Sequence, residues 1–233
     1  MRETSFDLDQ YVFSANGWQT PATHYPELSV GDFRIHHSYY SARSYYPMWG
    51  VKDYLYFTSA KRIPLAMLQE RRGSRWHTWM VDDPPHWYSM EVYAQAAKGR
   101  VLVAGLGLGL VCHCLTANPG VTAIDVIERS EDVIKLVKPL IPQDERISIQ
   151  QDDFYNWVEK KNRYDMIIVD LWTSSGKQQK ADMYYREVLP LYARLEWLYP
   201  AARKVFHGFV TLCDPCPISE EMMLLIREVK PYG

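Results

Sequence analysis

The chain has 233 residues, of which 47% are hydrophobic and 23% charged, enough for one large globular domain or for a domain with a substantial N-terminal extension. The formal net charge of −2 gives no bulk basic signal for nucleic acid, and no stretch reaches the ~18 consecutive apolar residues of a membrane span. Four cysteines do not make a disulfide scaffold, and the charged N-terminus lacks the apolar run of a signal peptide. We therefore expect a cytoplasmic protein without a membrane partner and with no strong signal for nucleic acid, although a local basic face stays possible.

The first 98 residues are expected to form two regions ahead of the main domain. Residues 1–30 carry prolines and polar residues without a clear period, so we expect an irregular N-terminal arm. Residues 31–98 are rich in aromatic residues and β-formers, and they predict a β-rich region. The aromatic side chains of this region would suit a homodimer contact.

Within the β-rich region the signals favour a hairpin and then a linking helix. Residues 65–70 and 75–80 are expected to pair across a turn that contains Gly73. The linking helix is expected to begin after Asp83, an N-cap residue ahead of two prolines, and to run to about Ala97, with Gly99 closing it.

Residues 99–233 change to an alternation of strands and helices. We expect strands at 100–104, 121–127, 146–150 and 164–169, and helices at 110–117, 131–140 and 154–160. This spacing predicts the α/β class, with a Rossmann-like, doubly wound, mostly parallel sheet and helices on both faces. Further on we expect a helix at 181–198 interrupted by Pro190, a strand or continued helix at 204–212, and a helix at 219–229.

The candidate site residues directly follow the four predicted strands. In an open α/β sheet, ligands bind beyond the carboxyl ends of the strands, so these positions are expected to meet at one edge. The candidates are Gly105, Leu106, Gly107 and Gly109 after the first strand, Glu128 and Arg129 after the second, Asp152 and Asp153 after the third, and Asp170 after the fourth. Glycine or acid at four successive strand ends predicts a site for a nucleoside-type cofactor.

The spacing of the glycines separates two classes of cofactor. The dinucleotide fingerprint is G-x-G-x-x-G/A, whereas here the third glycine comes one position early and Leu110 occupies the sixth position. S-adenosylmethionine carries a ribose diol, an adenine amine and a cationic sulfonium, and a carboxylate suits each of them. The acids after the second and third strands therefore favour S-adenosyl-L-methionine as the cofactor, with a small molecule as the acceptor.

Four phrases, VLVAGLGLGL, DVIERSEDVI, ISIQQDDF and YDMIIVDLW, carry a family resemblance. In this order and spacing they resemble class I S-adenosylmethionine-dependent methyltransferases, and more narrowly the spermidine-synthase-like branch. The resemblance implies that Gly105, Gly107 and Gly109 line the methionine and ribose. It further implies that Glu128 accepts from the ribose hydroxyls, that Asp152 and Asp153 meet the adenine amine, and that Asp170 lies nearest the sulfonium and the acceptor.

Two departures from the branch bear on the reaction. Polyamine aminopropyltransferases carry D-[ST]-[ST]-D-P after the fourth strand, whereas this chain has Asp170 but Thr173 in the place of the second aspartate. The tyrosine-histidine-glutamate phrase of the preceding helix is also incomplete, because Ser89 follows Tyr88. We therefore expect methyl transfer. Aminopropyl transfer from decarboxylated S-adenosylmethionine stays an alternative, as does a non-catalytic module that only binds the cofactor.

The remaining cysteines and histidines do not indicate a metal site. Cys213 and Cys216 have C-x-x-C spacing, but Cys112 and Cys114 lie on a predicted helix where alternate side chains point in different directions. His86 lies close to the predicted site, and both a packing role and a catalytic role stay open for it.

Overall fold

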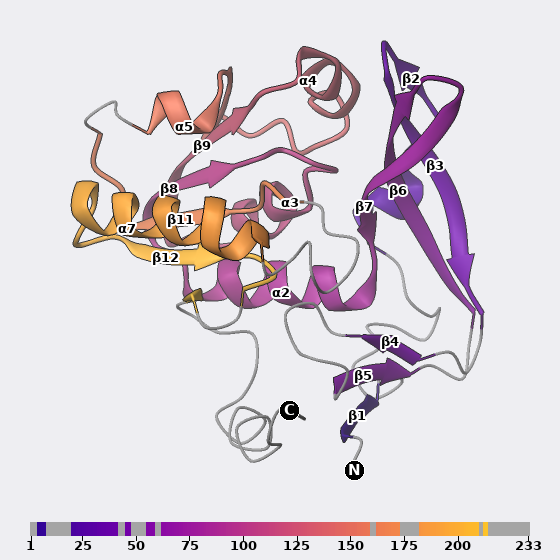
Figure 1. Ribbon diagram of the computed structural model, residues 1–233, viewed down its shortest axis with the longest axis horizontal. Coiled ribbons are helices and arrows are strands. Elements are labelled where there is room, and N and C mark those ends of the chain that lie inside the picture. The colour runs from indigo at the N-terminus through magenta and orange to yellow at the C-terminus, as the bar shows by residue number, and fades with distance from the viewer. Residues whose placement is uncertain are drawn as a thin grey trace.

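The computed structural model describes residues 4–7, 20–41, 45–47, 55–58, 62–158, 162–172, 182–209 and 212–213. Its main feature is a five-stranded parallel sheet with the order β10-β9-β8-β11-β12 (Figure 1). The strands are β8 (Gly99–Ala104), β9 (Val121–Glu128), β10 (Ile147–Gln151), β11 (Met166–Val169) and β12 (Arg203–Phe206). In chain order this is 3-2-1-4-5, the order of a Rossmann-like sheet, and the predicted fold class is confirmed.

Helices cover both faces of this sheet, because the side chains of its strands alternate between two hydrophobic cores. In β8, Val101 and Val103 pack in one core, and Leu102 and Ala104 pack in the other. The first core is covered by α2 (Pro84–Ala96), α3 (Leu110–Thr116) and α4 (Glu131–Val137). The second is covered by α5 (Phe154–Trp157), the π-helix η2 (Tyr184–Val188) and α7 (Leu189–Leu198).

An antiparallel sheet precedes the parallel one and stands beside α4 (Figure 1). Its order is β2-β3-β6-β7, with β2 (Ser29–Val30), β3 (Phe33–Tyr40), β6 (Ile63–Arg72) and β7 (Arg75–Asp82). The predicted hairpin is confirmed as β6 and β7, although its turn is shorter than expected, since Arg72 already pairs with Arg75. Because β7 leads directly into α2, the last residues of β7, Met80 among them, lie at the carboxyl edge of the parallel sheet.

The sequence-based expectation for residues 1–30 was an irregular arm, and the described part of this range contains regular elements. They are β1 (Thr4–Asp7), the 3-10 helix η1 (Pro21–His24) and β2. β1 pairs with β5 (Leu55–Thr58), which in turn pairs with β4 (Tyr45–Pro47), in a three-stranded sheet. These pairings join segments that are distant in the sequence, so a local reading of residues 1–30 had no access to them.

Three other expectations are corrected. Gly99 does not close the linking helix but begins β8, where its φ of 64° and its N–H bond to the Gly120 carbonyl start the parallel sheet. The helix at 131–140 ends at Val137 and continues as a turn. The helix expected at 181–198 is described from residue 182, and its irregularity is the π-helical turn η2, which ends at Val188, whereas Pro190 falls in the first turn of α7. Of the strand or continued helix expected at 204–212, the structure has a strand, β12, which ends already at Phe206. The predicted helix at 219–229 lies outside the described residues.

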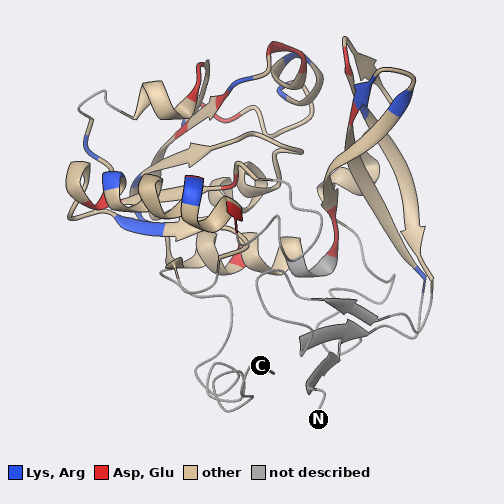
Figure 2. Cartoon of the chain, in the orientation of Figure 1, with Lys and Arg blue, Asp and Glu red and all other residues tan. Residues whose placement is uncertain are grey.

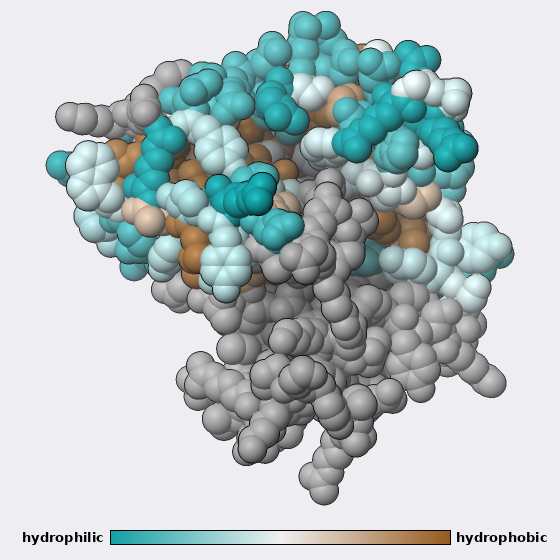
Figure 3. All heavy atoms as spheres, viewed as in Figure 1, coloured by the Kyte–Doolittle hydropathy of each residue, from teal (hydrophilic) through white to brown (hydrophobic). Residues whose placement is uncertain are grey.

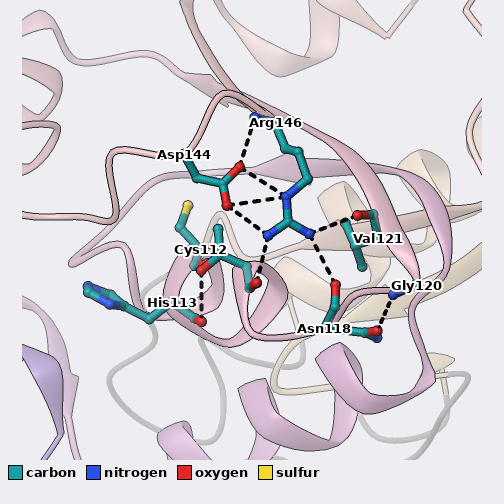
Figure 4. A network of polar contacts seen from close by, with 8 residues as sticks. Cys112, His113, Asn118, Gly120, Val121, Asp144 and Arg146 are labelled. Carbon is teal, nitrogen blue, oxygen red and sulfur yellow. Dashed lines mark hydrogen bonds and ion pairs between the residues drawn. The ribbon is translucent and has the colours of Figure 1, made fainter.

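A polar network at the amino ends of the strands holds the sheet from the side opposite the candidate site (Figure 4). The guanidinium of Arg146 donates to the carbonyl oxygens of Thr116, Asn118 and Val121 at 2.6 to 3.1 Å, and it is paired with Asp144 at 2.7 Å. One side chain therefore ties the end of α3 and the start of β9 to the start of β10.

The surface is polar where the antiparallel sheet projects furthest. Figure 3 shows a hydrophilic tip on the β6–β7 hairpin, and Arg71, Arg72 and Arg75 are exposed there. Arg71 donates to Asp32 at 2.8 Å. In the part of the chain that the structure describes, no helix is long and apolar enough to cross a membrane.

Candidate cofactor and acceptor site

Parallel strand pairing brings the predicted site residues to one edge of the sheet. Gly105 donates its N–H to the carbonyl of Ile127, Asp152 donates to Glu128, and Asp170 donates to Ala104, at 2.9 to 3.1 Å. The residues at the carboxyl ends of β8, β9, β10 and β11 are thus neighbours, and acidic residues are found along this edge in Figure 2. The expectation that these positions meet at one edge is confirmed by the strand register.

Three glycines shape the loop after β8, and each has a positive φ: 92° for Gly105, 52° for Gly107 and 73° for Gly109. A Cβ on Gly105 would lie 2.4 Å from the carbonyl oxygen of Asp170, and a Cβ on Gly107 would lie 2.3 Å from the sulfur of Met80. The loop therefore needs glycine for its backbone and for the close approach of its own neighbours, before any ligand is considered.

Met80, at the end of β7, covers this loop. Its sulfur lies 3.0 Å from the backbone nitrogen of Leu108 and accepts a hydrogen bond from it. Met80 also lines a cavity of about 10 Å³ together with His86, Gly105 and Asp170, which is room for about one water molecule. A larger ligand that extends from the glycine loop to Asp170 therefore requires Met80 to move, and the long unbranched side chain of methionine has the rotamers for this.

Glu128, at the end of β9, holds the glycine loop from its other side. One carboxylate oxygen accepts from the Leu106 N–H at 2.9 Å, and the second accepts from the Ser130 N–H at 2.7 Å. Leu106 contributes its backbone here, since its side chain is buried at 3% exposure. Arg129, also predicted at this site, is exposed. Glu128 thus joins the loop after β8 to the start of α4.

The two aspartates after β10 have different local roles. Asp153 is the N-cap of α5, and its side chain accepts from the Tyr155 N–H at 2.8 Å. Asp152 accepts from the Asp153 N–H at 2.9 Å. The backbone of Asp152 lies beside Glu128 at the edge, and each of the two carboxylates already accepts a hydrogen bond from a neighbouring backbone N–H.

Asp170 lies beside His86, which comes from the first turn of α2. The Nε2 atom of His86 is 3.6 Å from Oδ2 of Asp170, and the two side chains are 12% and 27% exposed. Burial raises the pKa of Asp170, and His86 acts in the opposite direction. Burial and the neighbouring His207 lower the pKa of His86 to about 4, so its imidazole is neutral at pH 7. The site thus combines a carboxylate with a neutral imidazole.

Two further residues of this cluster were missed at the sequence level. His207 follows β12 directly and is buried, and its ring centroid is 4.5 Å from that of His86. The hydroxyl of Tyr93 on α2 lies 3.4 Å from Nδ1 of His207. The rule that located Asp170, namely the residue after each strand, would have located His207 had the end of β12 been placed correctly. The expectation of no metal site stays a prediction: one ligand atom each from His86, Asp170 and His207 lie within 4.8 Å of one another.

Comparisons with known proteins agree with the spermidine-synthase-like resemblance. No protein-family model matches the chain. Over 101 residues the chain is 33% identical to a protein named polyamine aminopropyltransferase from Prochlorococcus marinus strain MIT 9312, and 35% identical to its namesake from strain MIT 9515. The chain resembles polyamine aminopropyltransferases. Each match covers 39% of this chain and 36% of the relative, so it concerns a part of both proteins.

Solved structures resemble the chain distantly. Spermidine synthase from Thermotoga maritima has a TM-score of 0.36 and 18% identity, with 47% of this chain and 45% of that chain covered. A dimethyladenosine transferase from Plasmodium falciparum has a TM-score of 0.38 and 18% identity, with 53% and 41% covered. The Rossmann-like assignment therefore rests on the strand order of the parallel sheet.

Proposed function

We propose that the chain is an S-adenosylmethionine-dependent transferase and that it transfers a methyl group to a small-molecule acceptor. The observation that carries the proposal is the shared edge of the glycine loop, Glu128 and Asp170. A loop with glycine at three alternate positions suits the close approach of the methionine part, the acid at the end of the second strand suits the ribose, and the partly buried carboxylate after the fourth strand suits the acceptor.

The residues of this edge have acceptor capacity left for the cofactor. A carboxylate has about four acceptor positions, and Glu128 uses one on the Leu106 N–H and one on the Ser130 N–H. Its remaining lone pairs suit the two ribose hydroxyls, and Asp152 suits the adenine amine. If the Met80 side chain moved away from Gly107, it would open the space next to the loop.

When bound, the cofactor supplies a methyl carbon made electrophilic by the sulfonium. Asp170 orients the N–H or O–H of the acceptor, and the acceptor's proton passes to its carboxylate. In such a transfer the electron pair of the broken C–S bond would stay on the sulfur of the cofactor. Burial supports this role, because it raises the pKa of Asp170 toward the pH at which a proton acceptor works well.

Aminopropyl transfer is the second candidate, and the names of the relatives favour it. Against it stands Thr173 at the position of the second aspartate in the aminopropyltransferase phrase. A non-catalytic binding module is the third candidate, and it would have no need of Asp170.

The product separates the three candidates. We would incubate the protein with S-adenosylmethionine or its decarboxylated form and with panels of polyamine, nucleic-acid and small-molecule acceptors, and follow the cofactor by mass spectrometry. Formation of S-adenosylhomocysteine supports methyl transfer, and methylthioadenosine identifies aminopropyl transfer. Calorimetric binding of S-adenosylhomocysteine without turnover of either cofactor identifies the binding module.

A further inference from the structure

Among the described residues, His86 is the side chain that is paired with Asp170. It reaches the carboxylate from α2, whereas Asp170 belongs to the end of β11. The nitrogen-to-oxygen distance of 3.6 Å is slightly longer than a hydrogen bond. Hydrogen bonds of catalytic groups are often long before the ligands bind, and they shorten in the complex.

Backbone contacts fix the positions of both imidazoles. The N–H of His86 donates to the N-cap side chain of Asp83 at 3.0 Å, so the residue sits in a capped first turn. The N–H of His207 donates to the carbonyl of Val169 at 2.8 Å, which places His207 next to Asp170. His86 is therefore held in a capped helical turn, and His207 is held against Val169 in the turn that directly follows β12.

The side chains behind His86 form a continuous row. His207 packs against the ring of His86 at 4.5 Å, and Tyr93 lies two helical turns after His86 on the same face of α2. The Tyr93 hydroxyl contacts Nδ1 of His207 at 3.4 Å and Sγ of Cys213 at 3.9 Å. This row leaves His86 little freedom to turn away from Asp170.

We propose that His86 is the positioning residue of Asp170: its Nε2–H donates to Oδ2 and turns the other carboxylate oxygen toward the acceptor, while His207 and Tyr93 hold the imidazole in place. The inference rests on the proposed function for its meaning, although the pair itself is a feature of the chain alone. A donor that stabilises the carboxylate also keeps it ionised in a site that burial makes unfavourable for charge.

A neutral donor has an advantage over lysine or arginine in this place. The proposed cofactor carries a positive sulfonium near Asp170, and a second full positive charge would repel it at short range. An imidazole donates a hydrogen bond without that charge. The low pKa of His86, about 4, agrees with a neutral donor at pH 7. The groups that face Asp170 or its partner row are His86 and Tyr93 from α2, His207 after β12, and Cys213 beside Tyr93.

The test compares His86→Leu, which cannot donate, with His86→Gln, whose amide N–H can. The control is His77→Leu, at an exposed histidine on β7. In the protein without cofactor, the 13C carboxyl resonance of Asp170, assigned by its loss in Asp170→Asn, reports the titration. We expect His86→Leu to move this titration to higher pH, and we expect His86→Gln and His77→Leu to leave it near the wild-type position.

Turnover gives the second readout. The acid limb of the pH profile of kcat should move to higher pH in His86→Leu by the same amount, with kcat at pH 7 reduced roughly tenfold or more and the KM for the acceptor unchanged. His86→Gln should recover most of kcat. If the Leu variant leaves both the Asp170 titration and the acid limb in place, the inference is refuted.

Two further outcomes are distinguishable. If the carboxyl titration moves but no acceptor is turned over by the wild type, the pairing holds and the proposed function fails. If chelation of the purified, untagged protein abolishes turnover and Zn²⁺ restores it, the cluster is a metal site and the positioning role is overturned.

Should His86→Leu not fold, Asp170→Asn serves instead: the 15N imidazole titration of His86 must move to lower pH, and an unchanged titration refutes the pairing.

Discussion

Replacement of Glu128 by alanine tests whether this proposed cofactor ligand also stabilises the fold, by joining the glycine loop to the start of α4. The carboxylate accepts hydrogen bonds from the backbone N–H groups of Leu106 and Ser130, at 2.9 and 2.7 Å. Alanine leaves both donors without this partner. The expected result is therefore a less stable protein even without cofactor, in addition to weaker cofactor binding.

The N–H groups of Leu106 and Ser130 differ in whether water can take the place of the lost carboxylate. The residue Leu106 is buried at 3% exposure, so its N–H loses a bond to a charged group that is worth about 1.5–3 kcal/mol. Ser130 is partly exposed, and water can compensate there for much of the loss. We expect Glu128→Ala to lower the free energy of unfolding by about 2–4 kcal/mol. Loss of the ribose acceptor should weaken S-adenosylhomocysteine binding by about 1.5–3 kcal/mol, roughly ten- to hundredfold.

Urea denaturation would give the free energy of unfolding, and calorimetry would give the affinity for S-adenosylhomocysteine. The control is Glu131→Gln, three positions further on, whose side chain is 57% exposed and paired with Lys135 on the same helix. Such a surface pair contributes about 0.3–0.5 kcal/mol, so this variant should stay close to wild type in both measurements. A Glu128→Ala protein as stable as the Glu131→Gln control would refute the claim that the two hydrogen bonds of Glu128 stabilise the fold. Unchanged affinity would refute the ribose assignment.

Three further predictions concern the loop, the acceptor side and the far edge of the sheet. Gly107→Val should abolish S-adenosylhomocysteine binding and lower the melting temperature, because φ is 52° and the sulfur of Met80 lies 2.3 Å from the new Cβ; retained affinity in calorimetry would contradict the role of the loop. Asp170→Asn should keep a near-normal melting temperature and lose turnover by at least ~10²-fold, and unchanged turnover would remove Asp170 from the chemistry. The pKa of Asp144 is lowered from 3.8 to about 2 by hydrogen bonds from Arg146, so this pair stabilises the fold above pH 4 and the benefit is lost as the pH falls toward 2. In thermal melts, Asp144→Asn should have a lower melting temperature than wild type at pH 5, and its melting temperature should fall less between pH 5 and pH 2. If the melting temperatures of the two proteins fall in parallel with pH, the pair does not contribute to stability.

Sequence periodicity alone was sufficient to predict the parallel sheet and the residues that meet at its carboxyl edge. Strands of the βαβ type run in the same direction, so the residue after each strand must emerge at the same edge, whatever the details of packing. Gly105, Glu128, Asp152 and Asp170 could be assigned to that edge for this reason. The register of β8 with β9 and β11 and the pairing of β9 with β10 bear this out.

Other features depended on contacts between segments that are far apart in the chain. Nothing in the local pattern says that Met80 covers Gly107, that His86 faces Asp170, or that His207 packs behind His86. These contacts arise because β7 of the antiparallel sheet continues directly into α2, and α2 packs against the parallel sheet. Residues of both sheets therefore lie around the candidate site. A period of two or of 3.6 residues reports which face of an element is buried, but it does not report which other element covers that face. The sequence by itself thus determined which residues meet at the carboxyl edge of the parallel sheet, and the tertiary structure decided which side chains surround the group proposed to carry out the chemistry.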